Sequence, residues 1–150
     1  MSDCPGKRFY DSFLDSNIIL DILLKNKVFY EESRSLLVLG DVHGIDYFVS
    51  ATSITDIYYI IHKYEKDDLK VRAHIANLLE VVSVAGIDES CVRNALNSSW
   101  KDFEDAVQNE AAVQINADYL VTRNTKDFTM TFVPVITPAD FIQLFDASSL

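Results

Sequence analysis

The stretch DFEDAVQNEAAVQINADYLVTRNTKDF, residues 102–128, decides the fold because it joins a helical pattern, a buried strand and a group of acids. Residues at three- or four-residue spacing would share one face of the helix: Ala106, Glu110, Val113 and Ala117. Asp102 and Asp105 lie one turn apart near its start. Their carboxylates are therefore expected to face the same way.

Behind this helix, Asn116–Asp118 interrupts the pattern, and Tyr119–Thr122 is a short apolar run that predicts a strand buried on both faces. Polar side chains follow the strand at once, at Arg123, Asn124, Lys126 and Asp127. In open α/β sheets, ligands bind outside the carboxyl ends of the strands. The helix start and the strand end are thus expected to deliver polar groups to one place.

Further strands and helices are predicted on both sides of this stretch. The strands span 9–14, 46–50, 81–84 and 132–136, and the helices span 18–24, 30–39, 52–63, 69–79, 89–96 and 141–145. Strands that alternate with helices predict an α/β fold with a mostly parallel sheet covered by helices. A length of 150 residues suits one domain, residues 1–150.

Single residues predict how some of these elements begin and end. Gly40 is expected to end the helix at 30–39, and Ser53 and Asp56 have the spacing of a capping box. Pro134 places the last strand at an edge of the sheet, because proline has no amide hydrogen for a ladder.

The composition limits the function classes. A net charge of −10 argues against nonspecific adhesion to nucleic acid or anionic membranes, so any nucleic-acid contact must be local. No apolar run approaches the roughly 20 residues of a membrane span, and the first residues lack a secretory signal, which predicts a cytoplasmic protein. Cys4 and Cys91 are too few and too far apart for a disulfide framework or a zinc site.

Carboxylates from four segments are expected at one edge of the predicted sheet. Asp15 follows the first strand, Asp56 follows the second, Asp102 and Asp105 begin a helix, and Asp127 follows a later strand. Clustered carboxylates repel one another or bind a hard cation, and oxygen ligands of this kind suit Mg²⁺ or Mn²⁺. Such a cation supports phosphodiester hydrolysis. Each acid taken alone is more often a helix cap or a solvated surface group than a metal ligand, and only their joint placement favours a metal site.

Other catalytic signatures are absent from the sequence. It contains no GxxxxGK[ST], GxSxG or GxGxxG motif, which excludes the usual P-loop, serine-hydrolase and dinucleotide-binding patterns. His43, His62 and His74 are scattered without the spacing of metal ligands.

Four segments, FLDSNIILDILL, SATSITDIYYI, DFEDAVQNEAA and ADYLVTRNTKDF, resemble the four signature blocks of PIN domains. The resemblance runs from about residue 13 to residue 141. It implies a three-layer α/β/α sandwich with a mostly parallel central sheet. It also implies a metal-dependent ribonuclease that uses Mg²⁺ or Mn²⁺, as in the toxins of bacterial toxin–antitoxin pairs.

The resemblance assigns roles by position. The four acids would be Asp15, Asp56, Asp105 and Asp127, and polar support would come from Ser16, Asn17 and Thr122. Two positions depart from the family pattern: Asp56 stands where the family usually has Glu, and Asn124 stands where some members have Asp. Asp102 could restore the charge that Asn124 lacks. A PIN-like binding module that has lost efficient catalysis is therefore the alternative, and a phosphoacceptor receiver domain ranks last.

An acidic ribonuclease needs a local basic rim for the RNA phosphates. The candidates are Arg123, Lys126, Lys101 and Lys7–Arg8, whose other interpretation is solvated surface charge. Trp100, or the pair Tyr58 and Tyr59, could stack on a base, although the tyrosine pair also suits a half-buried core position.

Two protein partners are expected. If the chain is a toxin, a separately encoded antitoxin would cover the acidic cleft, with an Arg or Lys among the carboxylates. A homodimer could form through apolar helical surface near 36–39 or 78–79, for which core packing is the favoured explanation.

Overall fold

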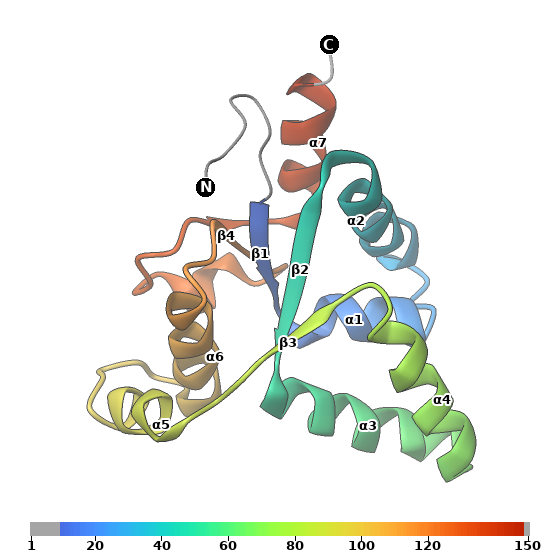
Figure 1. Cartoon of the computed structure of the whole chain (residues 1–150), viewed down its shortest axis with the longest axis horizontal. Coiled ribbons are helices and arrows are strands. Elements are labelled where there is room, and N and C mark those ends of the chain that lie inside the picture. Colours follow the sequence, from blue (N-terminus) through green and yellow to red (C-terminus); the bar gives the residue numbers. More distant parts are fainter. Residues whose placement is uncertain (1–9, 149–150) are drawn as a thin grey trace.

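The central sheet is parallel throughout and has the strand order β3-β2-β1-β4-β5 (Figure 1). The structure is a computed structural model that describes residues 10–148. The strands are β1 (Tyr10–Leu14), β2 (Ile45–Ser50), β3 (Ser83–Ala85), β4 (Tyr119–Val121) and β5 (Val135–Ile136). β5 lies at the edge, as Pro134 predicts.

Helices cover both faces of this sheet (Figure 1). They are α1 (Ser16–Leu23), α2 (Tyr30–His43), α3 (Ala51–Glu65), α4 (Asp68–Leu78), α5 (Glu89–Leu96), α6 (Phe103–Gln114) and α7 (Pro138–Ser148), with a 3₁₀ turn, η1 (Thr125–Phe128). Helices α1 to α4 and α7 lie on one side of the strands, and α5 and α6 lie on the other. The predicted three-layer α/β/α sandwich is confirmed.

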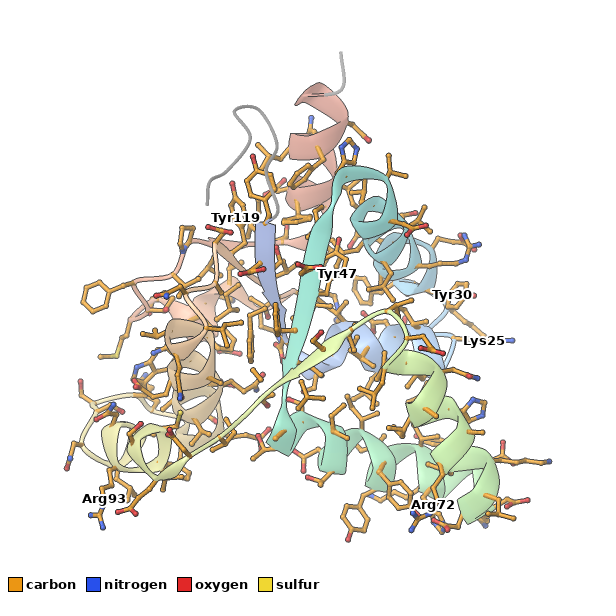
Figure 2. All side chains as sticks on the ribbon, in the orientation of Figure 1. Lys25, Tyr30, Tyr47, Arg72, Arg93 and Tyr119 are labelled. Atoms are coloured by element: carbon orange, nitrogen blue, oxygen red, sulfur yellow. The ribbon has the colours of Figure 1, made fainter. Side chains whose placement is uncertain are left out.

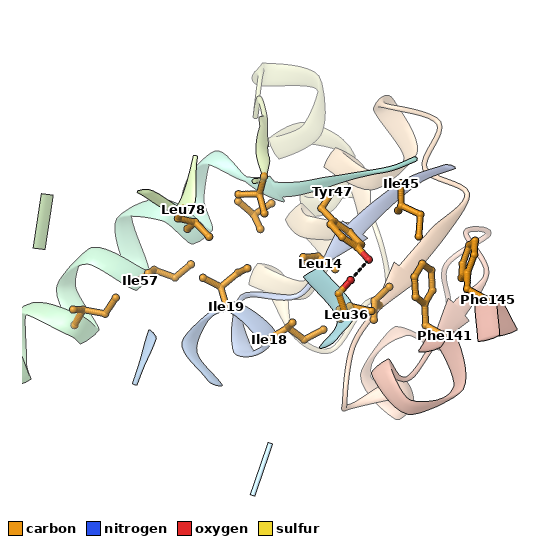
Figure 3. Packing of buried hydrophobic residues seen from close by; sticks show 14 of the residues in the cluster. Leu14, Ile18, Ile19, Leu36, Ile45, Tyr47, Ile57, Leu78, Phe141 and Phe145 are labelled. Atoms are coloured by element: carbon orange, nitrogen blue, oxygen red, sulfur yellow. Dashed lines mark hydrogen bonds between the residues drawn. The ribbon is translucent and has the colours of Figure 1, made fainter. Parts of the chain in front are cut away.

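Successive residues of β1 serve two different cores, because side chains alternate across a strand. Leu14 packs with Ile18, Leu36 and Phe141 on the side of α1, α2 and α7, where the Tyr47 hydroxyl also donates to the Leu36 carbonyl (Figure 3). Phe13 packs on the opposite side against the residues of α6, β4 and η1. β1 therefore has no solvent-facing side over its last residues, and its carboxyl end is fixed by both cores.

Gly40 does not end its helix, contrary to the prediction. α2 continues to His43, and Gly44 ends it in the left-handed conformation with φ of 68°. Gly40 instead provides room, because a Cβ there would lie 2.6 Å from Cε2 of Tyr47. Gly40 is therefore explained by its close approach to the ring of Tyr47 on the neighbouring strand, and Gly44 by the left-handed conformation that ends the helix.

Three local predictions shift in the structure. The N-cap of α3 is Ser50, whose Oγ accepts from the Ser53 amide at 3.1 Å, so the predicted capping box of Ser53 and Asp56 is wrong. The third strand is Ser83–Ala85 rather than 81–84. The buried face of α6 includes Ala111 and Ala112, whereas Val113 is 42% exposed.

The surface outside the sheet is ordinary for a charged protein. Arg93 points away from the body of the protein (Figure 2), whereas Arg72 lines the groove between α3 and α4. Each forms an exposed ion pair with an acid one turn earlier on its own helix. Leu36 and Leu78 are core residues, whereas Val38 and Leu79 are exposed, so the predicted dimer surface is only partly available. No helix among residues 10–148 is long and apolar enough to cross a membrane.

Of the two cysteines, the structure places only Cys91. Cys91 is a buried free thiol, as expected from the lack of a nearby partner. Cys4 and the candidate RNA-binding pair Lys7–Arg8 lie outside the described residues.

Candidate functional site

The carboxyl ends of β1 and β4 meet side by side and carry the first pair of site residues. Leu14 pairs with Val121, and the Asp15 amide donates to the Val121 carbonyl at 3.0 Å. One residue further on, Thr122 Oγ1 donates to Asp15 Oδ2 at 2.8 Å. Asp15 is only 6% exposed and Thr122 is fully buried. Residues 107 positions apart in the chain are therefore joined at the sheet edge, as the strand-end rule predicts.

Burial raises the pKa of Asp15 above its ordinary value. The Thr122 hydroxyl, the backbone amides of Asn17 and Ser16 and the charge of Arg123 oppose that rise. Asp15 is the N-cap residue of α1, although no hydrogen bond caps the helix through its side chain. The amides of Asn17 and Ser16 at the start of α1 favour its ionised form, so the cap position and the place in the acidic site belong to the same residue.

The start of α6 supplies the second group of acids. Asp102 is the N-cap, and its Oδ1 accepts from the Asp105 amide at 2.9 Å. The Asp105 side chain is thereby held one turn along, facing the sheet edge. Burial, followed by the charges of Asp102, Asp15, Asp127 and Glu104, raises the pKa of Asp105 to about 7. Asp102 therefore has a capping role and also contributes to the electrostatics of the cluster.

Glu104 belongs to the same cluster and was missed in the sequence. Burial raises its pKa, and the charges of Asp56, Asp102 and Asp15 add to the rise. Asp56 on α3 thus faces the cluster through Glu104. Glu104 adds a carboxylate within electrostatic reach of Asp56. Its position between Asp102 and Asp105 in the first helical turn was the available signal.

The chemistry of this cluster suits a hard cation, but its side chains stand apart. Among residues 10–148, no three His, Cys, Asp or Glu side chains converge closely enough to coordinate one metal ion. Burial is the main cause of the raised pKa of Asp105 and of Glu104, and the charges of neighbouring carboxylates add to both rises. In the described chain no Lys or Arg forms an ion pair with Asp15, Asp102, Asp105 or Asp127. A divalent cation would relieve this repulsion, so the donor set fits Mg²⁺ or Mn²⁺ in charge and ligand type.

The segment after β4 is tied to the cluster by Thr122. Its Oγ1 accepts from the Asn124 amide at 3.0 Å, and the Asn124 carbonyl accepts from the Asp127 amide at 3.0 Å within η1. Asn124 and Asp127 are exposed. Asp127 contributes to the raised pKa of Asp105, which places it within electrostatic reach of the other acids.

Arg123 is engaged elsewhere. Its Nε and Nη2 donate to the two carboxylate oxygens of Asp21, each at 3.0 Å, and its guanidinium lies 4.0 Å from the centre of the Phe29 ring. Asp21 also accepts from Ser33 Oγ at 3.1 Å. These contacts favour a structural role for Arg123 over the predicted contact with RNA. The buried Asp21 stands among apolar residues of α1, which was the only sequence signal for this ion pair.

The remaining candidates for substrate contact divide between two faces. Trp100, Lys101 and Lys126 lie around one cavity together with Asp102, Asp105 and Asp127. Tyr58 and Tyr59 instead line a groove between α3 and α4, where the Tyr58 hydroxyl donates to Asp68. The tyrosine pair is therefore not part of the acidic site, and the tryptophan is.

The match to a protein family agrees with this arrangement. The family model described as PIN domain matches residues 11–126, which include both strand ends and the start of α6. The chain belongs to the PIN domain family. The match covers three of the four signature blocks in full and the fourth up to residue 126, just before Asp127, and the resemblance seen in the sequence is confirmed.

Individual proteins that resemble this PIN domain share only a low sequence identity with it. The chain is 26% identical over 137 residues to ribonuclease VapC1 of Aquifex aeolicus, covering 87% of this chain and 92% of the relative. A toxin–antitoxin complex from Klebsiella pneumoniae is similar in structure, with a TM-score of 0.63 at 21% identity, covering 85% and 97% of the two chains. The sarcin–ricin loop cleaving toxin VapC20 of Mycobacterium tuberculosis has a TM-score of 0.58 at 12% identity, covering 73% and 86%.

Proposed function

We propose that this chain, acting as one domain, is a metal-dependent endoribonuclease that hydrolyses phosphodiester bonds of RNA, and that it is the toxin of a toxin–antitoxin pair. The observation that carries the proposal is the cluster of unpaired carboxylates, with Asp105 at a pKa of about 7, where β1, β4 and α6 meet. Membership in the PIN domain family and the ribonuclease name of the Aquifex aeolicus relative support it.

The metal ligands in this proposal are Asp15 and Asp105, with Asp127, Asp102 and Asp56 as further carboxylates. A bound Mg²⁺ or Mn²⁺ would lower the pKa of a water molecule and neutralise the charge that grows on the phosphodiester. Thr122 fixes the orientation of Asp15 by donating to its Oδ2. Asp102 fixes the first turn of α6 and with it the position of Asp105. Glu104 is an additional carboxylate that reaches the cluster from the same turn.

The negative charge of the same carboxylates is also the reason to expect an antitoxin partner. A cluster of carboxylates without a basic partner in the described chain attracts an Arg or Lys side chain from another protein. The similar fold found in the toxin–antitoxin complex from Klebsiella pneumoniae supports a protein partner of this kind. An antitoxin bound in this way would both stabilise the chain and exclude the metal.

A PIN-like binding module without catalysis is the second candidate. It is favoured by one observation: no trio of potential ligands converges among the described residues. Asn124, which carries no charge, and the short side chain of Asp56 are consistent with it. Such a module would bind RNA without cleaving it.

The deciding experiment is cleavage of mixed single-stranded and structured RNA by the purified protein, with Mn²⁺, with Mg²⁺ and with chelator. We expect cleavage only with metal, and a loss of at least roughly 100-fold in Asp15→Asn and in Asp105→Asn, because each substitution removes a charged ligand while it keeps the shape of the side chain.

Asp41→Asn is the matched control, because it makes the same substitution at an exposed position of α2. It should cleave like the wild type, and the loss of cleavage in the two site variants, purified in the same way, excludes a contaminating nuclease. Circular dichroism should report a folded protein for all three variants. Equal inactivity of wild type and variants with either metal would overturn the enzyme and leave the binding module.

A further inference from the structure

A cavity opens directly beside the acidic cluster, between the segment that precedes α6 and the turn η1. Its volume is about 330 Å³, at the lower end of the range of about 300–1,000 Å³ that ligand pockets occupy. The lining combines apolar surface from Trp100 and Met130 with two lysines and three aspartates, which are Lys101, Lys126, Asp102, Asp105 and Asp127. The cavity therefore shares three carboxylates with the acidic cluster and adds an aromatic wall and two cations to them.

Trp100 forms one wall of the cavity as well as packing against the hydrophobic core. The indole packs edge-on against the buried Phe128 with ring centroids 5.7 Å apart, which fixes its orientation. The residue is only partly buried and also lines the cavity. A fixed, partly open indole suits stacking with a planar ring, because the cost of ordering the side chain is already met by the core.

Lys101 and Lys126 come from opposite sides of the cavity. Lys101 immediately precedes the N-cap of α6, and Lys126 lies within η1. Both are exposed, and neither forms an ion pair within the described chain. Two free ammonium groups beside an aromatic wall are the combination that proteins use to follow a single strand, with phosphates on the cations and a base on the ring.

From this geometry we propose that the cavity is a subsite for one unpaired nucleotide of the substrate, with its base against Trp100 and its flanking phosphates on Lys101 and Lys126. The subsite rests on the proposed ribonuclease function, because its occupant continues into the acidic cluster. Asp105 lines the cavity and belongs to the cluster, so the bound nucleotide is next to the phosphodiester to be cleaved. The subsite favours single-stranded over double-stranded RNA, since a paired base cannot enter the cavity.

Trp100 also provides the measurement. It is the only tryptophan in the sequence, so the tryptophan emission of the protein reports on this cavity alone. The probe is a short single-stranded 2′-O-methyl RNA of mixed sequence with a fluorescent label at one end, because the 2′-O-methyl group prevents cleavage from changing the signal. Label anisotropy measures binding anywhere on the protein, and Trp100 emission measures occupancy of the cavity. We expect saturable quenching with the same midpoint as the anisotropy, with and without Mg²⁺.

The exposed lysines carry the main test, because their removal does not disturb the core. Lys101→Ala/Lys126→Ala should weaken binding and make the dependence of log K on log salt concentration shallower by about 1.4, since each lost phosphate contact on a single strand contributes about 0.7. Lys63→Ala/Lys70→Ala removes the same charge from exposed positions of α3 and α4 and should keep the wild-type slope. Trp100→Leu should weaken binding by about 5- to 150-fold, the range for loss of one base stack.

The possible outcomes distinguish failure of the proposed nucleotide subsite from failure of the proposed ribonuclease function. Binding seen by label anisotropy without a change in Trp100 emission, or equal salt slopes for the two lysine pairs, would overturn the subsite while metal-dependent cleavage of RNA could still be observed. No binding of the probe, together with no cleavage of natural RNA, would overturn the subsite and the proposed function together. Duplex probe that quenches Trp100 as strongly as the single strand would also contradict the subsite.

Discussion

Two buried aspartates at opposite ends of α1 have opposite surroundings. Asp21 is 3% exposed and meets two nitrogen atoms of Arg123 and the hydroxyl of Ser33. Asp15 is 6% exposed and meets the hydroxyl of Thr122, and it lies within electrostatic reach of Asp105. The difference teaches that burial alone does not mark a functional acid. A paired buried acid joins elements of the fold, whereas an acid buried among acids is a candidate for cation binding.

The Asp21 pair also supports the acidic site indirectly. It joins α1 to the residue that follows Thr122, and Phe29 covers the guanidinium from the segment before α2. α1 begins directly after Asp15, so the pair holds together the two segments that place Asp15 and Thr122. The positive charge of Arg123 additionally lowers the pKa of Asp15, although burial has the larger and opposite effect.

Breaking the paired region should have the largest effect on stability. Arg123→Met keeps much of the packing but leaves the carboxylate of Asp21 buried and unpaired, which is expected to cost about 3–5 kcal/mol of unfolding free energy. Asp21→Asn should cost less, because the guanidinium it leaves is 25% exposed and can be hydrated. Urea unfolding followed by circular dichroism measures both.

The control for this pair is Arg93→Met. It breaks an exposed ion pair between residues one turn apart on α5 and should lower the unfolding free energy by less than about 0.5 kcal/mol. If Arg123→Met lowered the unfolding free energy as little as Arg93→Met, the ion pair of Asp21 and Arg123 would not hold α1 and the end of β4 together.

The unpaired region should respond to metal instead. If Asp15 and Asp105 are ligands, Mg²⁺ or Mn²⁺ at about 100 times its dissociation constant should add about 2.7 kcal/mol of stability, because the ion binds the folded state only. The measurement is the melting temperature in a titration with each ion, at constant ionic strength. Asp15→Asn/Asp105→Asn should abolish the rise, and Asp41→Asn should keep it. An unchanged melting temperature of the wild type with both ions would count against the metal site.

The sequence predicted the fold well because the fold depends on periodic patterns that are local. The buried run 119–122 and the acids at strand and helix ends required only neighbouring residues to be recognised, and the structure brings Asp15, Asp105 and Asp127 within electrostatic reach of one another. Their catalytic role stays a prediction.

Partners that are far apart in the chain could not be predicted in the same way. Arg123 follows a strand end beside other polar residues, so it looked like a substrate contact, and nothing in the sequence pairs it with a residue 102 positions away. Glu104 was overlooked because an acid in a first helical turn is common and has a favourable interaction with the helix dipole. Its proximity to Asp56 depends on how α3 and α6 are placed across the sheet edge.

The smallest expected effect is a change in the free energy of unfolding at Asp105, with a sign opposite to that expected at Asp21. Without metal, Asp105 should destabilise the fold where it is ionised. Its pKa rises from an ordinary value of 3.8 to about 7, so the folded state binds the proton more tightly than the unfolded state does. Stability is therefore expected to be highest below about pH 4, to fall as the pH rises toward about 7, and to change no further above that, as far as this group is concerned.

Asp105→Asn should accordingly stabilise the metal-free protein at about pH 8 by about 1 kcal/mol, well below the full linkage value because the side chain is partly exposed to solvent. The gain should shrink as the pH falls and disappear near about pH 3, where Asp105 is protonated in both states, and it should reverse in saturating Mg²⁺ if the carboxylate is a ligand. Chemical unfolding in chelator and in Mg²⁺ at both pH values measures all of these. A loss of stability at the higher pH in chelator would mean that the Asp105 carboxylate has a favourable partner, and the contrast with Asp21 would then disappear.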